Sequence, residues 1–219
     1  NNVTGANNTG IGGNALYANT TGSNNTANGF RALYLNTTGA YNTASGFNSL
    51  YSATTATSNT AYGAHSLLNT TTGQNNVAVG KSALNFNTTG GTNVAVGMNV
   101  LYDNTTASYN TGVGYEAMRY NTTGAANTAF GYYSLKANTT GTQNTASGMY
   151  ALTSNTTASY NTAFGYYSLK ANTTGANNTA IGRAAGDNIT TGSSNIIIGA
   201  NVDAPSATAS NQLNIGNWI

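Results

Sequence analysis

Residues 161–177 read Asn161-Thr-Ala-Phe-Gly165-Tyr-Tyr-Ser-Leu-Lys-Ala-Asn-Thr-Thr-Gly-Ala-Asn177, and this 17-residue unit recurs along nearly the whole chain. An unbroken period of this length is typical of a solenoid, in which each unit buries its apolar side chains only against its neighbours. The sequence therefore predicts a solenoid of 17-residue coils. The first glycine of the unit, called the period glycine below, recurs without insertion or deletion at Gly12, Gly29, Gly46, Gly63, Gly80, Gly97, Gly114, Gly131, Gly148, Gly165, Gly182, Gly199 and Gly216.

The composition excludes several classes of function. Only ten of the 219 residues are formally charged, and the six basic ones are too dispersed for a nucleic-acid partner or an anionic membrane surface. No run of eighteen apolar residues exists, so membrane insertion is not expected. Cysteine is absent, so neither a disulfide nor a catalytic thiolate is available.

Residues 17 apart should form columns, because stacked coils lie ~4.8 Å apart, the spacing of hydrogen-bonded strands. The first column is nearly all asparagine: Asn8, Asn25, Asn42, Asn59, Asn76, Asn93, Asn110, Asn127, Asn144, Asn161, Asn178, Asn195 and then Gln212. Stacked amides can hydrogen-bond along such a column, and asparagine tolerates the left-handed conformation that a corner needs. We interpret the column as a structural corner, with glycan binding by the amides as the alternative.

Two further columns predict the core. Alanine stands two positions after the asparagine, and its flanking residues should point to the opposite face, which suits a surface between chains. Leucine stands four positions after the period glycine in most coils, and one buried leucine per coil supplies a cumulative core. The Gly-x-x-Ala-Leu stretch is too short for an independent helix, so we predict an all-β, parallel β-solenoid (β-roll).

A pair of consecutive threonines stands eight and nine positions after the period glycine in most coils, from Thr20 and Thr21 to Thr190 and Thr191. Threonine favours strands, its hydroxyl can bond a neighbouring coil, and only one of the two columns should face water. The preceding asparagine creates N-glycosylation sequons, which we interpret as a by-product of turn chemistry.

Chemically diverse side chains occur one, two and five positions after the period glycine. Tyrosines interleaved with Arg and Lys are typical of recognition surfaces, and packing between neighbouring chains is an equally weighted alternative. The residues predicted to form this receptor or interchain contact are Tyr115, Tyr132, Tyr133, Tyr150, Tyr166, Tyr167, Arg119, Lys136 and Lys170.

The units Asn76-Val-Ala-Val-Gly-Lys-Ser82 and Asn93-Val-Ala-Val-Gly97 resemble the repeats of trimeric autotransporter adhesin heads, and the longer pattern is similar to repeats in bacteriophage tail fibres. The ending Asn211-Gln-Leu-Asn-Ile-Gly-Asn217 resembles segments that lead into an endosialidase-type intramolecular chaperone. The resemblance implies a left-handed coil, a homotrimer, an extracellular location on a virion or cell surface, and host attachment through a cell-surface glycan or protein receptor. The 17-residue unit is longer than that of the adhesin heads.

The pattern divides the chain into regular repeats at 1–182 and degenerate terminal repeats at 183–219. Gly186 and Asp203 replace the leucine in the second segment, which we expect to lead into a missing C-terminal module. We read the chain as a piece of a longer protein.

Catalysis is not expected. The four acids fall in different columns, and only Asp187 and Asp203 could approach the spacing of a glycosidase pair. His65 has no second histidine or cysteine, so we expect a solvated surface residue and no metal or cofactor site. The predicted function is a structural or adhesive segment of a trimeric extracellular fibre. The alternatives are an ice-binding solenoid that uses the threonine columns and a polysaccharide-degrading tailspike.

Overall fold

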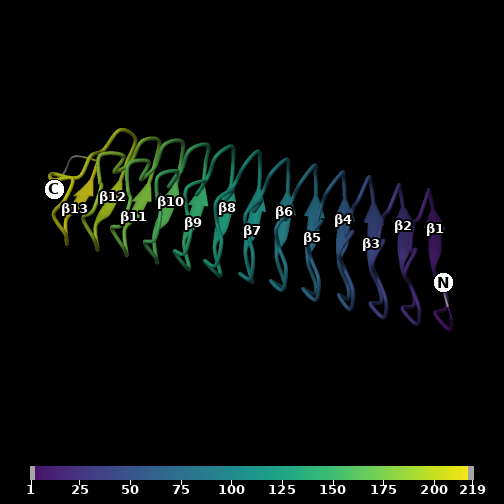
Figure 1. Ribbon diagram of the computed structural model, residues 1–219. Coiled ribbons are helices and arrows are strands. Elements are labelled where there is room, and N and C mark those ends of the chain that lie inside the picture. The colour runs from purple at the N-terminus through teal and green to yellow at the C-terminus, as the bar shows by residue number, and fades with distance from the viewer. Residues whose placement is uncertain (1–2, 217–219) are drawn as a thin grey trace. The chain divides into compact units, whose positions relative to one another are not determined.

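The computed structural model describes residues 3–216 as an all-β parallel solenoid in which no helix occurs. It has two compact units, Asn1–Tyr109 and Asn110–Ile219, which are described separately (Figure 1). The strands of the first unit are β1 (Thr9–Ile11), β2 (Thr26–Asn28), β3 (Thr43–Ser45), β4 (Thr60–Tyr62), β5 (Val77–Val79) and β6 (Val94–Val96). Those of the second are β7 (Thr111–Val113), β8 (Thr128–Phe130), β9 (Thr145–Ser147), β10 (Thr162–Phe164), β11 (Thr179–Ile181), β12 (Ile196–Ile198) and β13 (Leu213–Ile215).

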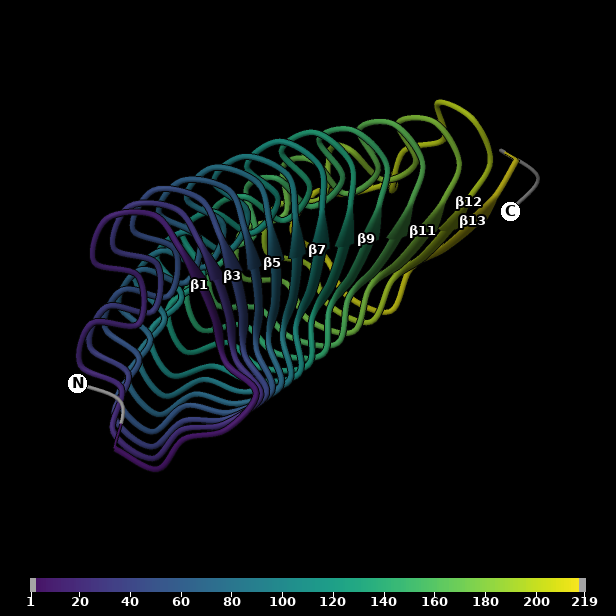
Figure 2. The same cartoon turned by 90° about the vertical axis from the view of Figure 1, so that its right-hand side faces the viewer.

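Within each unit, consecutive strands pair in parallel with a register of one repeat. Thr43 of β3 pairs with Thr60 of β4, and Thr128 of β8 pairs with Thr145 of β9. In each unit the loops of successive coils follow nearly the same path (Figure 2). The predicted β-solenoid with 17-residue coils is therefore confirmed.

Two columns form the core, as predicted. The alanines at the centre of most strands are fully buried, while the residues on either side of them point outward. The leucines from Leu33 to Leu169, with Met118 in the same column, are also fully buried. Each buried leucine stabilises the fold by roughly 1.5–3 kcal/mol relative to an exposed one, so the core grows with every coil.

The turn after each strand uses left-handed backbone conformations. The period glycines from Gly12 to Gly199 have φ between 117° and 140°. More unusually, the core leucines also have positive φ, for example 51° at Leu33 and 50° at Leu152. Such a conformation costs a bulky residue about 1–2 kcal/mol. It is retained because the leucine side chain is buried and its N–H bonds the next coil, as Leu33 N donates to Ser49 O at 3.0 Å.

The predicted asparagine ladder is present inside each unit. Asn144 is fully buried; its Nδ2 donates to Asn127 Oδ1 at 3.1 Å, and its Oδ1 accepts the main-chain N–H of Asn161 at 3.0 Å. Gln212 continues the ladder by donating to Asn195 Oδ1 at 3.2 Å. The left-handed residue of the corner, however, lies one position before the ladder, at Asn177 for instance, because the ladder asparagine must turn its side chain inward.

A second asparagine ladder runs through the asparagines that precede the threonine pairs. Asn138 Nδ2 donates to Asn121 Oδ1 at 2.7 Å and to Gly141 O at 2.9 Å, and its side chain is buried. These are the asparagines of the N-T-T sequons. In the folded chain their amides are engaged, which supports the interpretation of the sequons as turn chemistry.

The threonine pairs lie in bends, and the expectation that they form strands is wrong. The first threonine is half-buried and its hydroxyl bonds the next coil, as Thr139 Oγ1 donates to Thr156 O at 3.1 Å. The second threonine, such as Thr140, is exposed. Two of the predictions are thus confirmed: the inter-coil hydroxyl bond and the single water-facing column. The strand fails because three consecutive residues fold around one carbonyl of the neighbouring coil: Thr139 O accepts the main-chain N–H groups of residues 122, 123 and 124.

Candidate functional site

The charged and aromatic residues are concentrated on one turn of the coil. All ten charged residues, and eleven of the fifteen tyrosines, stand one to six positions after a period glycine. In the second unit this turn carries all nine predicted contact residues, and we call them and Glu116 the tyrosine edge. The stack elsewhere presents amides, hydroxyls and uncharged apolar groups, so this turn, which also carries Arg183, Asp187 and Asp203, is where charge meets solvent in this unit.

The six predicted tyrosines form one continuous set of ring contacts over four coils of the second unit. Tyr115 stacks on Tyr132 with ring centroids 5.3 Å apart, and Tyr132 lies 4.0 Å from Tyr133. Tyr150 contacts Tyr133 at 5.5 Å and Tyr167 at 5.2 Å. Tyr166 completes the set at 3.9 Å from Tyr167. Aromatic pairs in this range attract one another, so the rings hold each other in place.

The rings nevertheless stay accessible. Tyr115, Tyr132 and Tyr166 are 37%, 38% and 36% exposed, and the other three are half-buried. A tyrosine that is packed on one side and wet on the other loses little conformational entropy when it binds a partner. The arrangement therefore suits recognition.

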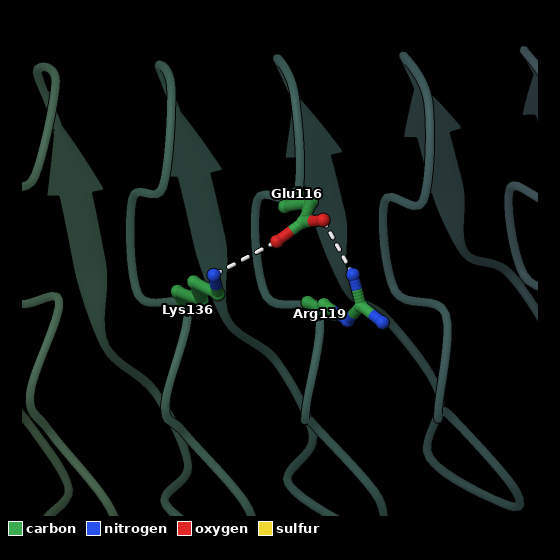
Figure 3. A network of polar contacts seen from close by, with 3 residues as sticks. All are labelled: Glu116, Arg119 and Lys136. Atoms are coloured by element: carbon green, nitrogen blue, oxygen red, sulfur yellow. Dashed lines mark hydrogen bonds and ion pairs between the residues drawn. The ribbon is translucent and has the colours of Figure 1, made fainter.

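Glu116 lies between two cations of this edge, Lys136 and Arg119, and contacts both (Figure 3). Only 4% of the residue is exposed; one of its carboxylate oxygens accepts a hydrogen bond from Arg119, and the other lies 2.8 Å from Lys136 Nζ. Burial alone would raise the pKa of Glu116, but the hydrogen bonds from Lys136 and Arg119 outweigh it and hold that pKa below its usual range. Burial acts to lower the pKa of Lys136, but the hydrogen bond with Glu116 outweighs it, so the pKa of Lys136 is raised above its usual value.

The cations also lie over aromatic rings. Lys136 Nζ is 3.7 Å from the centroid of Tyr133, and Lys170 Nζ is 4.2 Å from that of Tyr167. Arg119 lies over Tyr120, at 5.4 Å, a ring in a column that the sequence analysis did not include. Such contacts fix a cation near the surface without neutralising it.

The phenol groups themselves are linked. A hydrogen bond with Glu116 raises the pKa of Tyr115, and one with Tyr133 raises that of Tyr132. A hydrogen bond with Tyr167 raises the pKa of Tyr166 in the same way. Each of these three phenols is therefore neutral at physiological pH, and because its single proton is already engaged, it meets a ligand as a hydrogen-bond acceptor.

A second exposed surface, which we call the strand face, consists of the first and third residues of each strand. None of these residues is charged. The large exposed apolar residues on it include Ile11 and Tyr62 in the first unit and Phe130, Phe164, Ile181, Ile196, Leu213 and Ile215 in the second. The sequence analysis anticipated a mixed face here but not its aromatic members. Their column, one residue before the period glycine, was the available signal.

Three exposed tyrosines lie neither on the strand face nor on the turn that follows the period glycine. Tyr41, Tyr109 and Tyr160 occupy the left-handed corner before the asparagine ladder, and Phe or Tyr at positive φ has no local sequence signature. Sequence reasoning therefore missed them. They could have been found only by reading this column, which otherwise holds residues such as Asn, Ser and Ala.

The remaining candidate residues lie apart from the tyrosine rings. Burial and a hydrogen bond with Asp203 raise the pKa of Asp187, so these two carboxyl groups do meet across successive coils. His65 is half-buried with its ring edge-on to Phe47 at 5.3 Å, so it packs against the preceding coil on one side while part of it stays in contact with solvent. Among residues 3–216, no group of three or more His, Asp or Glu side chains could hold a metal ion.

The part of the chain that the structure describes contains no helix of the length and apolarity that crossing a bilayer requires. No protein-family model, no curated protein and no solved structure matches this chain. What is shown is thus a β-solenoid repeat protein with asparagine ladders. A more specific function has to be argued from the two exposed surfaces.

Proposed function

We propose that this chain is a structural and adhesive segment of an extracellular homotrimeric fibre, such as a tail fibre or a bacterial surface adhesin, in which three left-handed solenoids associate. The observation that carries the proposal is the separation of roles within one coil. Ladders, core and backbone repeat with little change, while all ten charged residues and most aromatic rings stand on the turn one to six positions after a period glycine. Such a stack holds a recognition surface in place without taking part in chemistry. Trimer, handedness and location rest on the resemblance to adhesin and tail-fibre repeats.

The strand face is the surface that best fits contact with sister chains. Phe164 is 60% exposed, and Ile181 follows it in the same column one coil later. Exposed apolar residues aligned along a stack mark an interaction site, and a face without charge meets its own copy without repulsion. A second copy has the same 17-residue period, so the columns of two parallel copies remain in register.

Light scattering of the purified chain tests the assembly. The expected mass is about 67 kDa, three times the 22.2 kDa of one chain. Phe164→Ser combined with Ile181→Ser should shift this mass toward that of one chain, whereas Thr174→Ser, an exposed change on another column, should not. A mass of one chain for the unaltered protein contradicts the trimer.

The proposal includes neither catalysis nor a cofactor, nucleic acid or membrane insertion. The tailspike alternative would need two carboxylates at a glycosidase spacing, and Asp187 and Asp203 instead hydrogen-bond each other. The ice-binding alternative would need a flat face with two regular threonine columns. In the threonine pairs only the second residue, such as Thr140, is exposed, whereas the first, such as Thr139, is half-buried with its hydroxyl bonded to the next coil, so the pairs present one water-facing column and not two.

A further inference from the structure

The exposed charge of the tyrosine edge is positive. The Glu116 side chain is 5% exposed, whereas those of Arg119 and Lys136, which contact it, are 28% and 22% exposed. Lys170 and Arg183 are exposed on the following coils, and within residues 3–216 neither forms an ion pair closer than 4 Å.

Two further acids stand on this turn: Asp187, which is half-buried and interacts electrostatically with Lys170, and Asp203, which is exposed. The four cations of the turn in the second unit still outnumber its three acids, of which only Asp203 is exposed. The balance of exposed charge is therefore positive and attracts an anionic ligand.

Besides charge, the edge offers partly exposed aromatic rings. Tyr115, Tyr132 and Tyr166 stand in one column and are each more than a third exposed, with Met149 between the last two. Because the coils repeat at the ~4.8 Å spacing of strands, a linear polymer that lies along the stack meets an equivalent turn at each step. Repeated weak contacts of this kind add up through effective concentration.

Main-chain groups on this turn are already paired between coils. Tyr133 N donates to Tyr115 O at 3.0 Å, and Leu135 N donates to Ala151 O at 2.9 Å. A peptide therefore finds no open strand edge on which to add itself by backbone hydrogen bonds. Recognition is left to aromatic rings, hydroxyls and cations, which suit a ligand rich in hydroxyl and carboxylate groups.

We infer that the tyrosine edge of the second unit binds an extended polysaccharide that carries carboxylate groups, with its sugar rings against the tyrosines and its carboxylates at Lys170 and Arg183. This inference rests on the proposed adhesive function and names the ligand class of the same surface. A cation recognises a carboxylate by charge-assisted hydrogen bonds, and arginine does so with two parallel ones.

The test measures binding of the full chain to oligogalacturonate by calorimetry, beside its carboxyl-reduced neutral form and polyglutamate. Oligogalacturonate should bind, the neutral form should bind much more weakly, and added salt should weaken binding. Lys170→Gln and Arg183→Gln should each raise the Kd by roughly three- to tenfold, and Tyr166→Ala by a similar factor. Circular dichroism checks that these exposed substitutions leave the fold intact.

Tyr160→Ala is the matched control. Tyr160 is an exposed tyrosine of the same unit on a different column, and Ala126 shows that alanine fits that column. Its Kd should equal that of the unaltered chain. An equal loss in this variant would overturn the inference, because the binding would not depend on the tyrosine edge.

Other outcomes also decide. Equal binding of the neutral oligosaccharide refutes the role of charge, and tighter binding of polyglutamate shows that the occupant is an acidic peptide. Absence of binding to oligogalacturonate by a sample that light scattering shows to be trimeric refutes this inference and leaves the fibre proposal standing. Binding by a sample with the mass of one chain supports the inference while contradicting the trimer.

Discussion

Removal of one rung of the asparagine ladder should destabilise the second unit strongly. Asn144→Ala deletes the donor to Ala158 O (2.8 Å) and to Asn127 Oδ1 (3.1 Å), and the acceptor of Asn161 N–H (3.0 Å). Ala158 O keeps a second donor, Asn155 Nδ2 at 3.0 Å, so Asn161 N–H is the group left buried without a partner. One such orphan costs about 1–3 kcal/mol and each of the two further lost bonds about 0.5–1.5 kcal/mol, which predicts a total loss of ~2–6 kcal/mol.

Urea unfolding followed by circular dichroism measures the total, and hydrogen exchange of the peptide around Asn161 locates it, because repeat arrays open locally. Thr174→Ala serves as control, since this exposed threonine should change stability by no more than about 0.5 kcal/mol. Asn144→Asp adds a second variant. Its buried carboxylate should have a raised pKa, so its deficit should be largest at neutral pH and shrink in mild acid. An Asn144→Ala protein as stable as the control would refute the reasoning that the ladder carries the stack.

Three further predictions concern the turns. Gly148→Ala should lower the free energy of unfolding by more than ~3 kcal/mol, measured by thermal unfolding, because φ is +140° and the new Cβ would lie 2.4 Å from Gly165 O. The control Ala125→Gly, at a half-buried position, should lower it far less. Glu116→Gln should remove part of the loss of stability in acid. Because the pKa of Glu116 is lower in the folded than in the unfolded chain, its carboxylate stabilises the fold above the unfolded-state pKa, and this stabilisation is lost as pH falls through the folded-state pKa. Identical acid titrations of the two proteins would contradict this. Asp187→Asn should raise the stability by roughly 0.5 kcal/mol at neutral pH and leave it unchanged in acid, because burial first, and then the hydrogen bond and repulsion with Asp203, raise the pKa of Asp187, so its ionised form destabilises the fold as pH rises. A loss at neutral pH would show that the pair is favourable.

Much of the fold was predictable because stacking places equivalent residues of successive coils in the same environment, so every residue of a column meets the same physical constraint. The period glycine, the inward alanine and the buried leucine are each restricted in size by the coil above and below, and the restriction is visible in the sequence. The Gly148 environment shows why: the backbone of the next coil lies where a Cβ would be. A column in which nearly every coil has the same residue type can therefore be predicted to be buried.

The left-handed positions were not predictable in the same way. Leu152 has φ of 50° and Tyr160 has φ of 63°, although neither residue type favours that region. The stack imposes the conformation through inter-coil hydrogen bonds such as Leu152 N to Ser168 O at 3.0 Å, so the cause lies in the neighbouring coil and not in the local sequence. For the same reason the threonine pairs, which favour strands in isolation, lie in bends.

The sequence predicted which columns carry the candidate site, but it did not predict how the side chains of those columns contact one another. The sequence places Glu116 two positions after its glycine and Lys136 five positions after the next one, but nothing local shows that the carboxylate contacts the ammonium group. That depends on side-chain directions at the left-handed Glu116, whose φ is 53°. The positive outward charge on which the ligand inference rests is therefore a product of the turn, not of composition.

The confinement of chemical variety to the tyrosine edge follows from the way in which the coils contact each other. At the ladder and core columns, a changed side chain meets the same column of two neighbouring coils at strand spacing, so one misfit disturbs three coils at once. At the tyrosine edge the main chain already satisfies its hydrogen bonds through pairs such as Tyr150 N to Tyr132 O at 2.9 Å, and the side chains leave the coil. Rings and charges can therefore be exchanged there without altering the stack. A recognition segment requires a variable surface on an invariant scaffold. The tyrosine edge meets this requirement, which is the physical reason to seek the ligand there.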